Sequence, residues 1–338
     1  MTARWFALGM AGLAGTILFA GWWWSRLPAP PAQAEAFFVP EATDAPVTPI
    51  PRALNLDARK VALGARLFQD RRLSADDSTA CVDCHRLDAA GQDSRAVAIG
   101  LRAQRGTMNS PTVFNSGFNF RQFWDGRAAT LEEQAAGPVH NPIEMGSNWP
   151  QVLAKLAQDE ALMKEFRVIW GQGPSGERIQ EAIAVFERSL TTPDAAFDRY
   201  LRGDAQALGE EALAGWRLFH DLGCSACHQG VNLGGNLYAN LGVMGDYFAE
   251  RGRPVQKSDL GRYNVTGLVT DRHVFKVPTL RNVARTAPYF HDGSIERLDE
   301  AVRTMARYQL GLQLADAEVR RLTAFLESLT GRHAGQPL

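Results

Sequence analysis

The sequence is poor in cysteine: its 338 residues contain four. Each cysteine belongs to a Cys-x-x-Cys pair, and a histidine follows each pair directly. None is therefore left for a structural disulfide or a four-cysteine zinc site. Two Cys-x-x-Cys-His motifs are the pattern of covalent haem attachment, in which the cysteines bind the vinyl groups and the histidine binds the iron. We predict two c-type haems, held by Cys81, Cys84 and His85 and by Cys224, Cys227 and His228.

An excess of one charge is also lacking. Lys and Arg number 36 and Asp and Glu number 37, so the formal net charge is -1 at pH 7. A protein that binds nucleic acid through its phosphates needs a basic surface, and this balance does not indicate one. The chain has no acidic tail either. Its composition predicts an ordinary globular protein that binds no nucleic acid and is long enough for two domains.

The chain has one long apolar run, at residues 5–24, with tryptophans at both ends. About 20 apolar residues are enough to span a bilayer, and a cleavable signal peptide has a shorter apolar core. We predict that residues 1–34 form a membrane anchor; the alternative is a signal peptide cleaved near Ala34. Covalent haem attachment implies the outer side of the bacterial inner membrane, so both alternatives predict a periplasmic protein. Residues 35–51, rich in proline and alanine, are predicted to be a linker.

The chain repeats itself. The pattern G-x-R-L-F-x-D occurs at residues 64–70, before the first haem motif, and at residues 215–221, before the second. After each haem motif a Pro-Thr pair, at Pro111 and at Pro278, is followed at identical offsets by Asn, by Asp-Gly and by Leu. These matches predict a tandem duplication of one haem-binding unit.

Helices are the expected secondary structure, because neither half shows convincing strand alternation. Apolar periodicity predicts a closing helix at residues 179–190 in the first half and at residues 317–329 in the second. The second helix is expected to be capped by Asp316 and stopped by Gly331. Haem is expected to replace much of the apolar core of each half.

The second axial ligand decides what each haem does. In the second half, Met305 lies two helical turns beyond Leu298 on the same predicted face. A thioether opposite His228 would give a six-coordinate iron of raised potential, suited to electron transfer. A methionine at such a position can also be a core residue that fills a gap.

The first half offers no equivalent ligand. Pro138 stands where the second half has Met305, and no His, Met or Lys occurs between His85 and Met108. His140 and Met145 are the remaining candidates downstream. The stretch EEQAAGPVHNPIEM places Gln134 and Glu144 in a loop broken by prolines. An open iron face beside a carboxylate would be a site for general acid–base chemistry, although both residues could instead be ordinary surface side chains.

From about Leu54 to Gly331 the chain resembles the bacterial dihaem cytochrome c peroxidases, a superfamily that includes the methylamine-utilisation maturation enzyme. The stretches RLSADDSTACVDCH, NSPTVFNSGFNFRQFWDGRAATLEEQAAGPVHNPIEM and DRHVFKVPTLRNVARTAPYFHDGS carry the resemblance. It implies an all-α fold with two tandem cytochrome c-like domains, which we expect at residues 52–204 and 205–338. The first would carry the peroxidatic haem and the second the electron-transfer haem.

The resemblance also implies roles for particular residues. Gln134 and Glu144 match the pair beside the open iron, and Trp124 matches a tryptophan between the haems. The His228 haem would have Met305 as its second ligand. A calcium ion between the domains is implied, with carbonyl and amide oxygens of a suitable kind for that cation. Its ligands would come from Asn109, Thr286 and Pro288.

One position departs from the family pattern. Many family members carry a removable histidine that blocks the first haem until the second is reduced, and here that position is Leu101. Leucine cannot bind iron, so we expect a first haem that is open without reductive activation. His140 does not match that position, although the sequence does not exclude that it reaches the iron.

The expected function is reduction of hydrogen peroxide to water with electrons from a small redox protein, a monohaem cytochrome c or a cupredoxin. One alternative is an enzyme that oxidises a partner protein through a high-valent dihaem state. A second is a membrane-anchored dihaem electron carrier, for which Met108, His140 or Met145 would have to bind the first iron. Family members often form homodimers, and the sequence leaves that state open.

Overall fold

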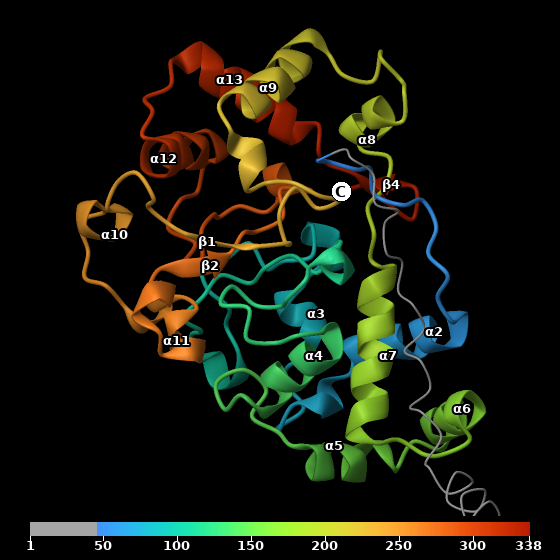
Figure 1. The fold of residues 1–338 in the computed structure, drawn as a ribbon. Helices are drawn as coiled ribbons and strands as arrows, with labels where there is room; N and C mark the ends of the chain where they lie inside the picture. The colour runs from blue at the N-terminus through green and yellow to red at the C-terminus, as the bar shows by residue number, and fades with distance from the viewer. Residues whose placement is uncertain (1–45) are drawn as a thin grey trace, which may run out of the picture. The chain divides into compact units, whose positions relative to one another are not determined.

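Helices joined by long loops make up most of the structure, a computed structural model that describes residues 46–338 (Figure 1). The predicted anchor or signal segment, residues 1–34, lies outside the described residues, as does the predicted linker up to residue 45. No helix in the described part of the chain has the length and apolar character that a bilayer crossing requires.

The helices follow one another along the chain with few strands between them. The longer ones are α2 (Ala58–Phe68), α4 (Leu131–His140), α5 (Trp149–Leu156), α6 (Glu160–Trp170), α7 (Gly176–Ser189), α9 (Glu210–Asp221), α12 (Leu298–Leu310) and α13 (Asp316–Glu327). The short ones are α3 (Cys81–Cys84), α8 (Ala196–Leu201), α10 (Tyr247–Glu250) and α11 (Tyr263–Thr266). Single 3₁₀ turns include η5 (Cys224–Ala226) and η8 (Val283–Arg285).

Two small antiparallel sheets correct the all-α expectation to a mostly helical fold. Strands β1 (Tyr238–Asn240) and β2 (Val274–Lys276) form the first pair, and β3 (Arg332–His333) and β4 (Gln336–Pro337) form the second. Strands of two or three residues are too short for period-two alternation to show in the sequence, which explains why they were not predicted.

Both repeats build the same crossing of two helices at a glycine. Gly64 of α2 lies against the backbone carbonyl of Ala182 in α7, and Gly215 of α9 lies against the carbonyl of Arg321 in α13. A β-carbon at either position would collide with that carbonyl. The glycine of the repeated G-x-R-L-F-x-D pattern is therefore the point of closest contact between the two helices of each half.

Replacing Gly215 by alanine is expected to lower the free energy of unfolding by about 1–3 kcal/mol, the usual cost of overpacking a core. The collision outweighs the gain of about 1 kcal/mol that alanine brings to a helix interior. Denaturant unfolding of the haem-loaded protein measures the change. Gly173→Ala is the control, because nothing lies within 4 Å of a β-carbon built there; equal stability of both variants would contradict the expected collision.

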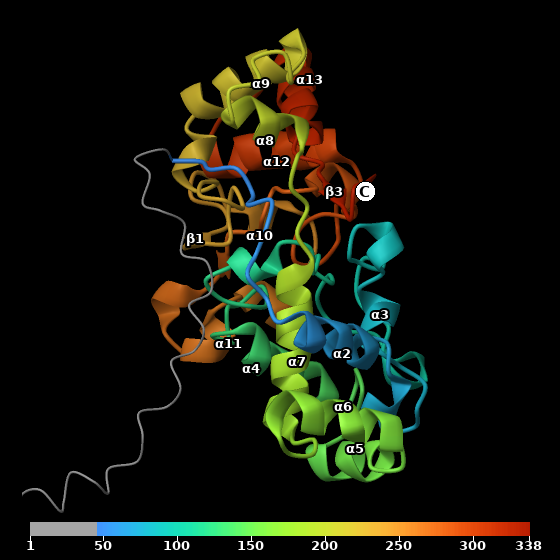
Figure 2. The ribbon, with the colours of Figure 1, turned by 90° about the vertical axis from the view of Figure 1, so that its right-hand side faces the viewer.

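The longer helices form two groups (Figure 2), and each group encloses an apolar core. The first is formed by side chains of α2, α4, α5, α6 and α7, among them Leu67, Phe68, Phe166 and Ile183. The second is formed chiefly by α9 and α13 and includes Phe219, Leu322 and Phe325. Phe197 of α8 also belongs to the second core, although it precedes residue 204, where the first domain was predicted to end.

The repeats are joined through a hydrogen-bonded junction at Thr192. The amide nitrogens of Asn115 and Asn282, which occupy the same place in the two repeats, donate to the Thr192 hydroxyl over 2.8 and 3.0 Å. The backbone of both asparagines has the left-handed conformation, with φ of 61° and 64°. Asparagine tolerates this conformation better than most residues. Their backbone N–H groups hold the carbonyls of Leu190 and Leu329 beyond the closing helices.

A second, reciprocal contact joins the repeats near the haem motifs. The backbone N–H of Asn109 donates to the carbonyl of His291 over 2.8 Å, and that of Lys276 donates to the carbonyl of Trp124 over 2.8 Å. Asn109 and Lys276 each stand two residues before the repeated Pro-Thr pair, and Trp124 and His291 each precede the repeated Asp-Gly. Equivalent positions of the two repeats therefore contact each other in both directions.

The closing helices lie where apolar periodicity predicted them, but they begin and end at other residues than predicted. The first is α7, which begins at Gly176 behind the capping side chain of Ser175. The second, α13, begins at Asp316, so that residue is not its cap: the N–H of Ala315 instead donates to the Glu318 carboxylate over 2.8 Å. The helix ends at Glu327, so Gly331 does not stop it. Gly331 instead lies close to the carbonyl of Thr192, where a β-carbon would collide.

Candidate functional site

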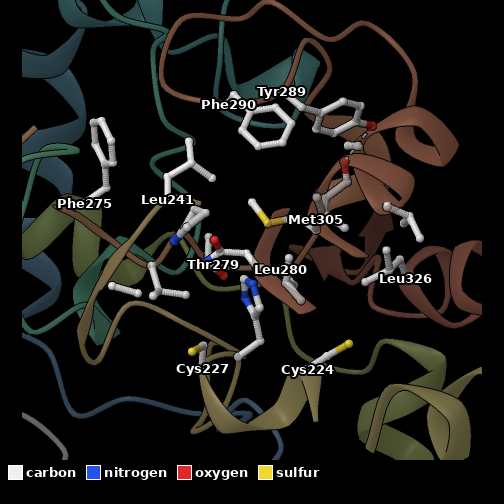
Figure 3. Close-up of a pocket in the computed structure, with 18 of the residues that line it drawn as sticks. Cys224, Cys227, Leu241, Phe275, Thr279, Leu280, Tyr289, Phe290, Met305 and Leu326 are labelled. Carbon is white, nitrogen blue, oxygen red and sulfur yellow. Dashed lines mark hydrogen bonds between the residues drawn. The ribbon is translucent and has the colours of Figure 1, made fainter. Parts of the chain in front are cut away.

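The second cysteine pair opens onto a cavity of about 480 Å³ (Figure 3). Cys224 and Cys227 enter it from η5 and the residue after it, and His228 follows directly. Met305 of α12 lines the same cavity, together with Leu298 two turns earlier on that helix. Cavities of 300–1,000 Å³ with mostly apolar walls are typical of small-molecule and cofactor sites. The structure thus brings together the four residues predicted to hold the second haem.

Both haem-motif histidines are oriented by a backbone carbonyl. The Nδ1 atom of His228 lies 3.1 Å from the carbonyl of Leu233, and that of His85 lies 3.3 Å from the carbonyl of Gly91. A carbonyl only accepts, so Nδ1 carries the hydrogen and Nε2 keeps the lone pair that binds a metal. Burial lowers the pKa of His228 to about 4 and also lowers the pKa of His85, so both rings are neutral at pH 7.

The cysteines fit covalent attachment better than thiol chemistry. They form no disulfide, and burial raises the pKa of Cys81 to about 12 and those of Cys84 and Cys224 to about 11. Reactive or metal-binding cysteines have depressed pKa values in electropositive surroundings. Buried thiols beside a neutral, oriented imidazole are a donor set that suits a thioether-linked haem.

In the first half, the haem motif lies close to Glu144. Cys81–Cys84 form α3, and the Cys84 thiol contacts the carbonyl of Ile99 at 3.8 Å. Two residues on, the N–H of Leu101 donates to the carbonyl of Glu144 over 2.8 Å, and Leu101 is 5 % exposed. The electrostatic field of Glu144 acts on Cys84. Leu101 is therefore the direct neighbour of Glu144.

Glu144 is a partly buried carboxylate in a polar setting. Its Oε1 accepts a hydrogen bond from the Asn141 amide over 2.6 Å. Burial raises the pKa of Glu144, and the Asn141 hydrogen bond and the charge of Arg127 offset part of that rise. A carboxyl whose pKa is moved towards neutrality is suited to taking up and returning a proton.

Gln134 is not in a loop, which corrects the sequence interpretation. It lies in α4, which begins behind Thr130 and contains Pro138 in its last turn. Pro138 has no N–H to donate to the carbonyl of Gln134, four residues earlier, so one backbone hydrogen bond of the last turn is missing. Glu144 does lie in the turn after α4, as predicted, and it makes no hydrogen bond with Gln134 among the described residues.

Two other candidate ligands of the first iron have different surroundings. His140, at the end of α4, is exposed and its ring packs edge-on against Trp149 with centroids 5.3 Å apart. Met145 is 3 % exposed and belongs to the first apolar core. Both contacts account for these side chains without a metal.

Trp124 lies at the junction of the repeats and lines the cavity of the second half. Its indole N–H donates to the carbonyl of Asn109 over 3.0 Å, and its ring packs edge-on against His291 with centroids 6.5 Å apart. A residue of the first repeat thus forms part of the wall around the second haem motif.

The three predicted calcium ligands also lie together. Asn109, Thr286 and Pro288 line the same cavity. The Asn109 amide nitrogen donates to the carbonyl of Arg95 over 2.9 Å, which leaves the amide oxygen for another partner. The carbonyls of Thr286 and Pro288 accept no hydrogen bond in the described part of the chain. Neutral oxygens of this kind are donors that suit calcium.

A cluster of Asp259, His291 and Asp292 has metal-ligand composition, but its charges are already paired. Arg251 contacts both carboxylates, and Arg253 contacts Asp292. His291 lies 2.7 Å from Asp259 through Nε2. Two guanidinium groups against two carboxylates make this an ion-pair network.

Two buried charged residues near the haem motifs were not predicted. Lys276 lines the second cavity, and Glu187 of α7 is 5 % exposed and acts electrostatically on Cys81. The internal repeat contained the signal, because aligning the closing helices pairs Glu187 with Leu326, which lines the second cavity. Where one repeat has a charged residue and the other has an apolar residue at the same aligned position, the surroundings of the two haem motifs differ.

Glu187 is expected to make stability depend on pH. Burial raises its pKa from 4.5 to about 8, so between these values the folded protein holds a proton that the unfolded chain releases. The contribution of Glu187 to stability is therefore fully present below pH 4.5 and falls as pH rises through that window. Glu187→Gln should remove the slope and gain about 2–4 kcal/mol over the wild type at pH 8. Unfolding at several pH values measures this, with exposed Glu296→Gln as control; parallel curves for wild type and Glu187→Gln would contradict it.

Comparison with known proteins gives a consistent family. Residues 58–206 match the family model described as di-haem cytochrome c peroxidase. The chain is 50 % identical to the cytochrome c peroxidase Ccp of Escherichia coli, over 86 % of this chain and 62 % of that protein, so it spans less than two thirds of that relative. It is 43 % identical to the cytochrome c551 peroxidase of Nitrosomonas europaea, over 86 % and 85 % of the two chains.

A solved structure agrees with the fold. A MauG-like protein associated with microbial copper homeostasis aligns with a TM-score of 0.74 and 28 % identity, over 87 % of this chain and 95 % of that one. The chain is a member of the di-haem cytochrome c peroxidase family.

Proposed function

We propose that this protein reduces hydrogen peroxide to water with electrons from a small redox protein, a monohaem cytochrome c or a cupredoxin. The observation that carries the proposal is the contact between Leu101 and Glu144 beside the first haem motif. This backbone hydrogen bond brings the segment of Leu101, a residue that cannot bind iron, next to the segment that carries the Glu144 carboxyl group. The second motif instead faces Met305 across its cavity. The two sites would therefore do different work.

Each haem would be held by residues already described. Cys81, Cys84 and His85 would hold one, and Cys224, Cys227, His228 and Met305 the other. Bound there, the first haem supplies the redox chemistry that breaks the peroxide O–O bond, and the second supplies a store for one electron. The net reaction consumes one peroxide, two electrons and two protons and yields two waters.

Glu144 is the proposed proton carrier. Its carboxylate takes a proton from the bound peroxide and returns it to the departing oxygen, which leaves as water. Asn141 holds one carboxylate oxygen through its 2.6 Å hydrogen bond, so the other oxygen is the one available for transfer. Gln134 is proposed to orient the peroxide.

Trp124 is the proposed path for electrons between the two sites. Its ring lines the second cavity, while its chain segment belongs to the first repeat. The hydrogen bond from its indole to Asn109 holds the ring in place. The donor protein would dock near the second haem and deliver electrons one at a time.

Several finer features belong to the same proposal. The two repeats would act as cytochrome c-like domains, at residues 52–204 and 205–338, with a calcium ion held by Asn109, Thr286 and Pro288. Residues 1–34 would direct the protein to the periplasm as an anchor or as a cleaved signal. A homodimer is the oligomer that the family resemblance suggests.

Electron paramagnetic resonance of the oxidised, as-isolated protein tests the asymmetry. We expect a high-spin ferric signal from an open first haem and a low-spin signal from the second. A spectrum with no high-spin iron would contradict a first site that is open at rest. Steady-state turnover with peroxide and a reduced cytochrome then tests the activity itself.

Oxidation of a partner protein is the second candidate, and the leucine at position 101 favours it, because the methylamine-utilisation maturation enzyme also lacks the removable histidine. That enzyme has a tyrosine ligand at its second haem, where this chain has Met305. Rapid steady-state turnover with a reduced cytochrome would exclude this candidate. An electron carrier without catalysis would need Met108, His140 or Met145 as a ligand of the first iron. Other contacts account for His140 and Met145, which leaves Met108, and binding of cyanide to one of two haems would exclude this candidate.

A further inference from the structure

Lys276 is an isolated charge in the wall of the second cavity. It is the last residue of β2 and is 6 % exposed. Among the residues that line this cavity, Lys276 is the one Lys, Arg, Asp or Glu. Its ammonium group makes no hydrogen bond or ion pair with the described residues, and its backbone N–H is used by the carbonyl of Trp124.

A buried ammonium group without a partner is costly. Removal from water costs several kcal/mol per ion unless an opposite charge or hydrogen bonds compensate. Burial accordingly lowers the pKa of Lys276 to about 8, with no other group contributing. Since the walls of the cavity hold no carboxylate, the compensating anion has to come from whatever fills the cavity.

The occupant proposed above carries such anions. A haem is an apolar ring with two propionate carboxylates, and the cavity is apolar apart from a few polar groups and this one cation. We propose that the Lys276 ammonium forms an ion pair with a propionate of the haem held by Cys224, Cys227, His228 and Met305, and so raises the reduction potential of that haem. The inference rests on the haem placement proposed above.

The direction of the effect follows from electrostatics. Reduction adds an electron to the haem, and a positive charge next to it favours the form with the extra electron. The pair would lie inside a cavity with mostly apolar walls, where the interaction is screened less than at the surface. A thioether ligand and a buried cation would then act in the same direction, towards a haem that accepts an electron readily.

The repeat has a neutral residue at the position equivalent to Lys276. The first repeat has Asn109 there, and both residues line the cavity of the second half. A neutral amide makes no ion pair with a carboxylate. The second repeat therefore supplies the cation of this cavity wall, and the first repeat supplies an uncharged residue.

Three variants of the full-length, haem-loaded protein test the inference. Lys276→Gln removes the charge, Lys276→Arg keeps it, and Lys257→Gln removes one exposed lysine from the same half as the matched control. Haem content is measured first. Redox titration then measures both midpoint potentials, and redox-difference infrared spectra of protein with ¹³C-labelled propionates report the carboxylate bands.

We expect Lys276→Gln to lower the reduction equilibrium constant of one haem at least tenfold, about 59 mV for one electron, and to shift a labelled carboxylate band. Lys276→Arg should keep the potential within threefold in that constant while shifting the same band, because a guanidinium binds a carboxylate in a different geometry. Lys257→Gln should change neither.

Unchanged potentials and unchanged carboxylate bands in Lys276→Gln would overturn the ion pair. If that variant accumulates no haem-loaded protein, Lys276→Arg decides, and unchanged bands there would overturn it as well. A wild-type protein with fewer than two haems per chain would instead contradict the proposed haem placement, so the two failures are distinguishable.

Discussion

Replacing Glu144 by glutamine is expected to lower kcat/KM for hydrogen peroxide by about 10²–10⁴-fold, the usual contribution of a positioned general acid–base group. Glutamine keeps the size of the side chain and an oxygen that can accept the Asn141 hydrogen bond, but it cannot take up and return a proton. The haem content and the reduction potential of the second haem should stay close to wild type. Peroxide consumption with saturating reduced donor, measured per haem, gives the ratio.

The pH profile separates proton transfer from a structural effect. Because burial raises the pKa of Glu144, wild-type kcat/KM should fall towards acid with a midpoint above the ordinary value of 4.5. The carboxylate is the active form as a base, so activity is present above the raised pKa and is lost below it. Glu144→Gln should lack this acid limb.

The matched control is Glu296→Gln, an exposed carboxylate of the second half, which should keep both the rate and the limb. Retention of the acid limb in Glu144→Gln would assign it to another group. Near-normal turnover of that variant would remove Glu144 from the chemistry altogether, whatever the shape of the profile.

The residues around the second cavity could be predicted from the sequence because they are encoded locally. A five-residue motif contains Cys224, Cys227 and His228, and a seven-residue spacing on one helix face is enough to align Met305 with Leu298. The structure places all five of them in the wall of one cavity. The repeat was equally visible, since identical offsets from Pro111 and Pro278 do not depend on any fold.

What could not be predicted depends on contacts between distant segments. The prolines around Gln134 indicated a loop, but α4 continues through Pro138 to His140 with one backbone hydrogen bond missing. Asp316 had the residue type of a helix cap, and the Glu318 carboxylate took the capping bond to Ala315 instead. Lys276 has no acidic neighbour in the cavity wall because distant segments of the chain form that wall. The sequence around Lys276 could not predict this.

At the helix crossings the sequence showed the repeated glycine, but it did not show why a glycine is needed there. The glycines at positions 64 and 215 belong to the repeated G-x-R-L-F-x-D stretch, yet glycine is a poor helix former. The reason lies in the partner helix, whose backbone carbonyl occupies the space of a β-carbon. A repeated glycine inside two predicted helices therefore signals a close helix approach.

Replacing Met305 by leucine is expected to lower the midpoint potential of the second haem by about 120 mV or more. Axial ligands set haem potentials over a range of about 0.8 V, and a thioether raises the potential. A fall of 120 mV corresponds to about a hundredfold in the one-electron equilibrium constant. Steady-state activity with a reduced cytochrome should fall by about 10–100-fold, because the second haem would no longer take an electron readily from its donor.

Leucine is the right replacement because it fills nearly the same volume as methionine, so the cost in stability stays below about 1.5 kcal/mol. Met163→Leu is the control: this methionine packs against the first apolar core, and its loss should change neither potential.

The two interpretations of Met305 then separate cleanly. If Met305 is a core residue, both variants should behave alike, with small changes in stability and unchanged reduction potentials. If Met305 binds the iron, Met305→Leu should shift the reduction potential of one haem strongly and change its ligand-field spectrum. That haem should then also bind external ligands, which the wild type excludes. An unshifted second haem in Met305→Leu would leave this chain without the electron store on which its proposed peroxidase cycle depends.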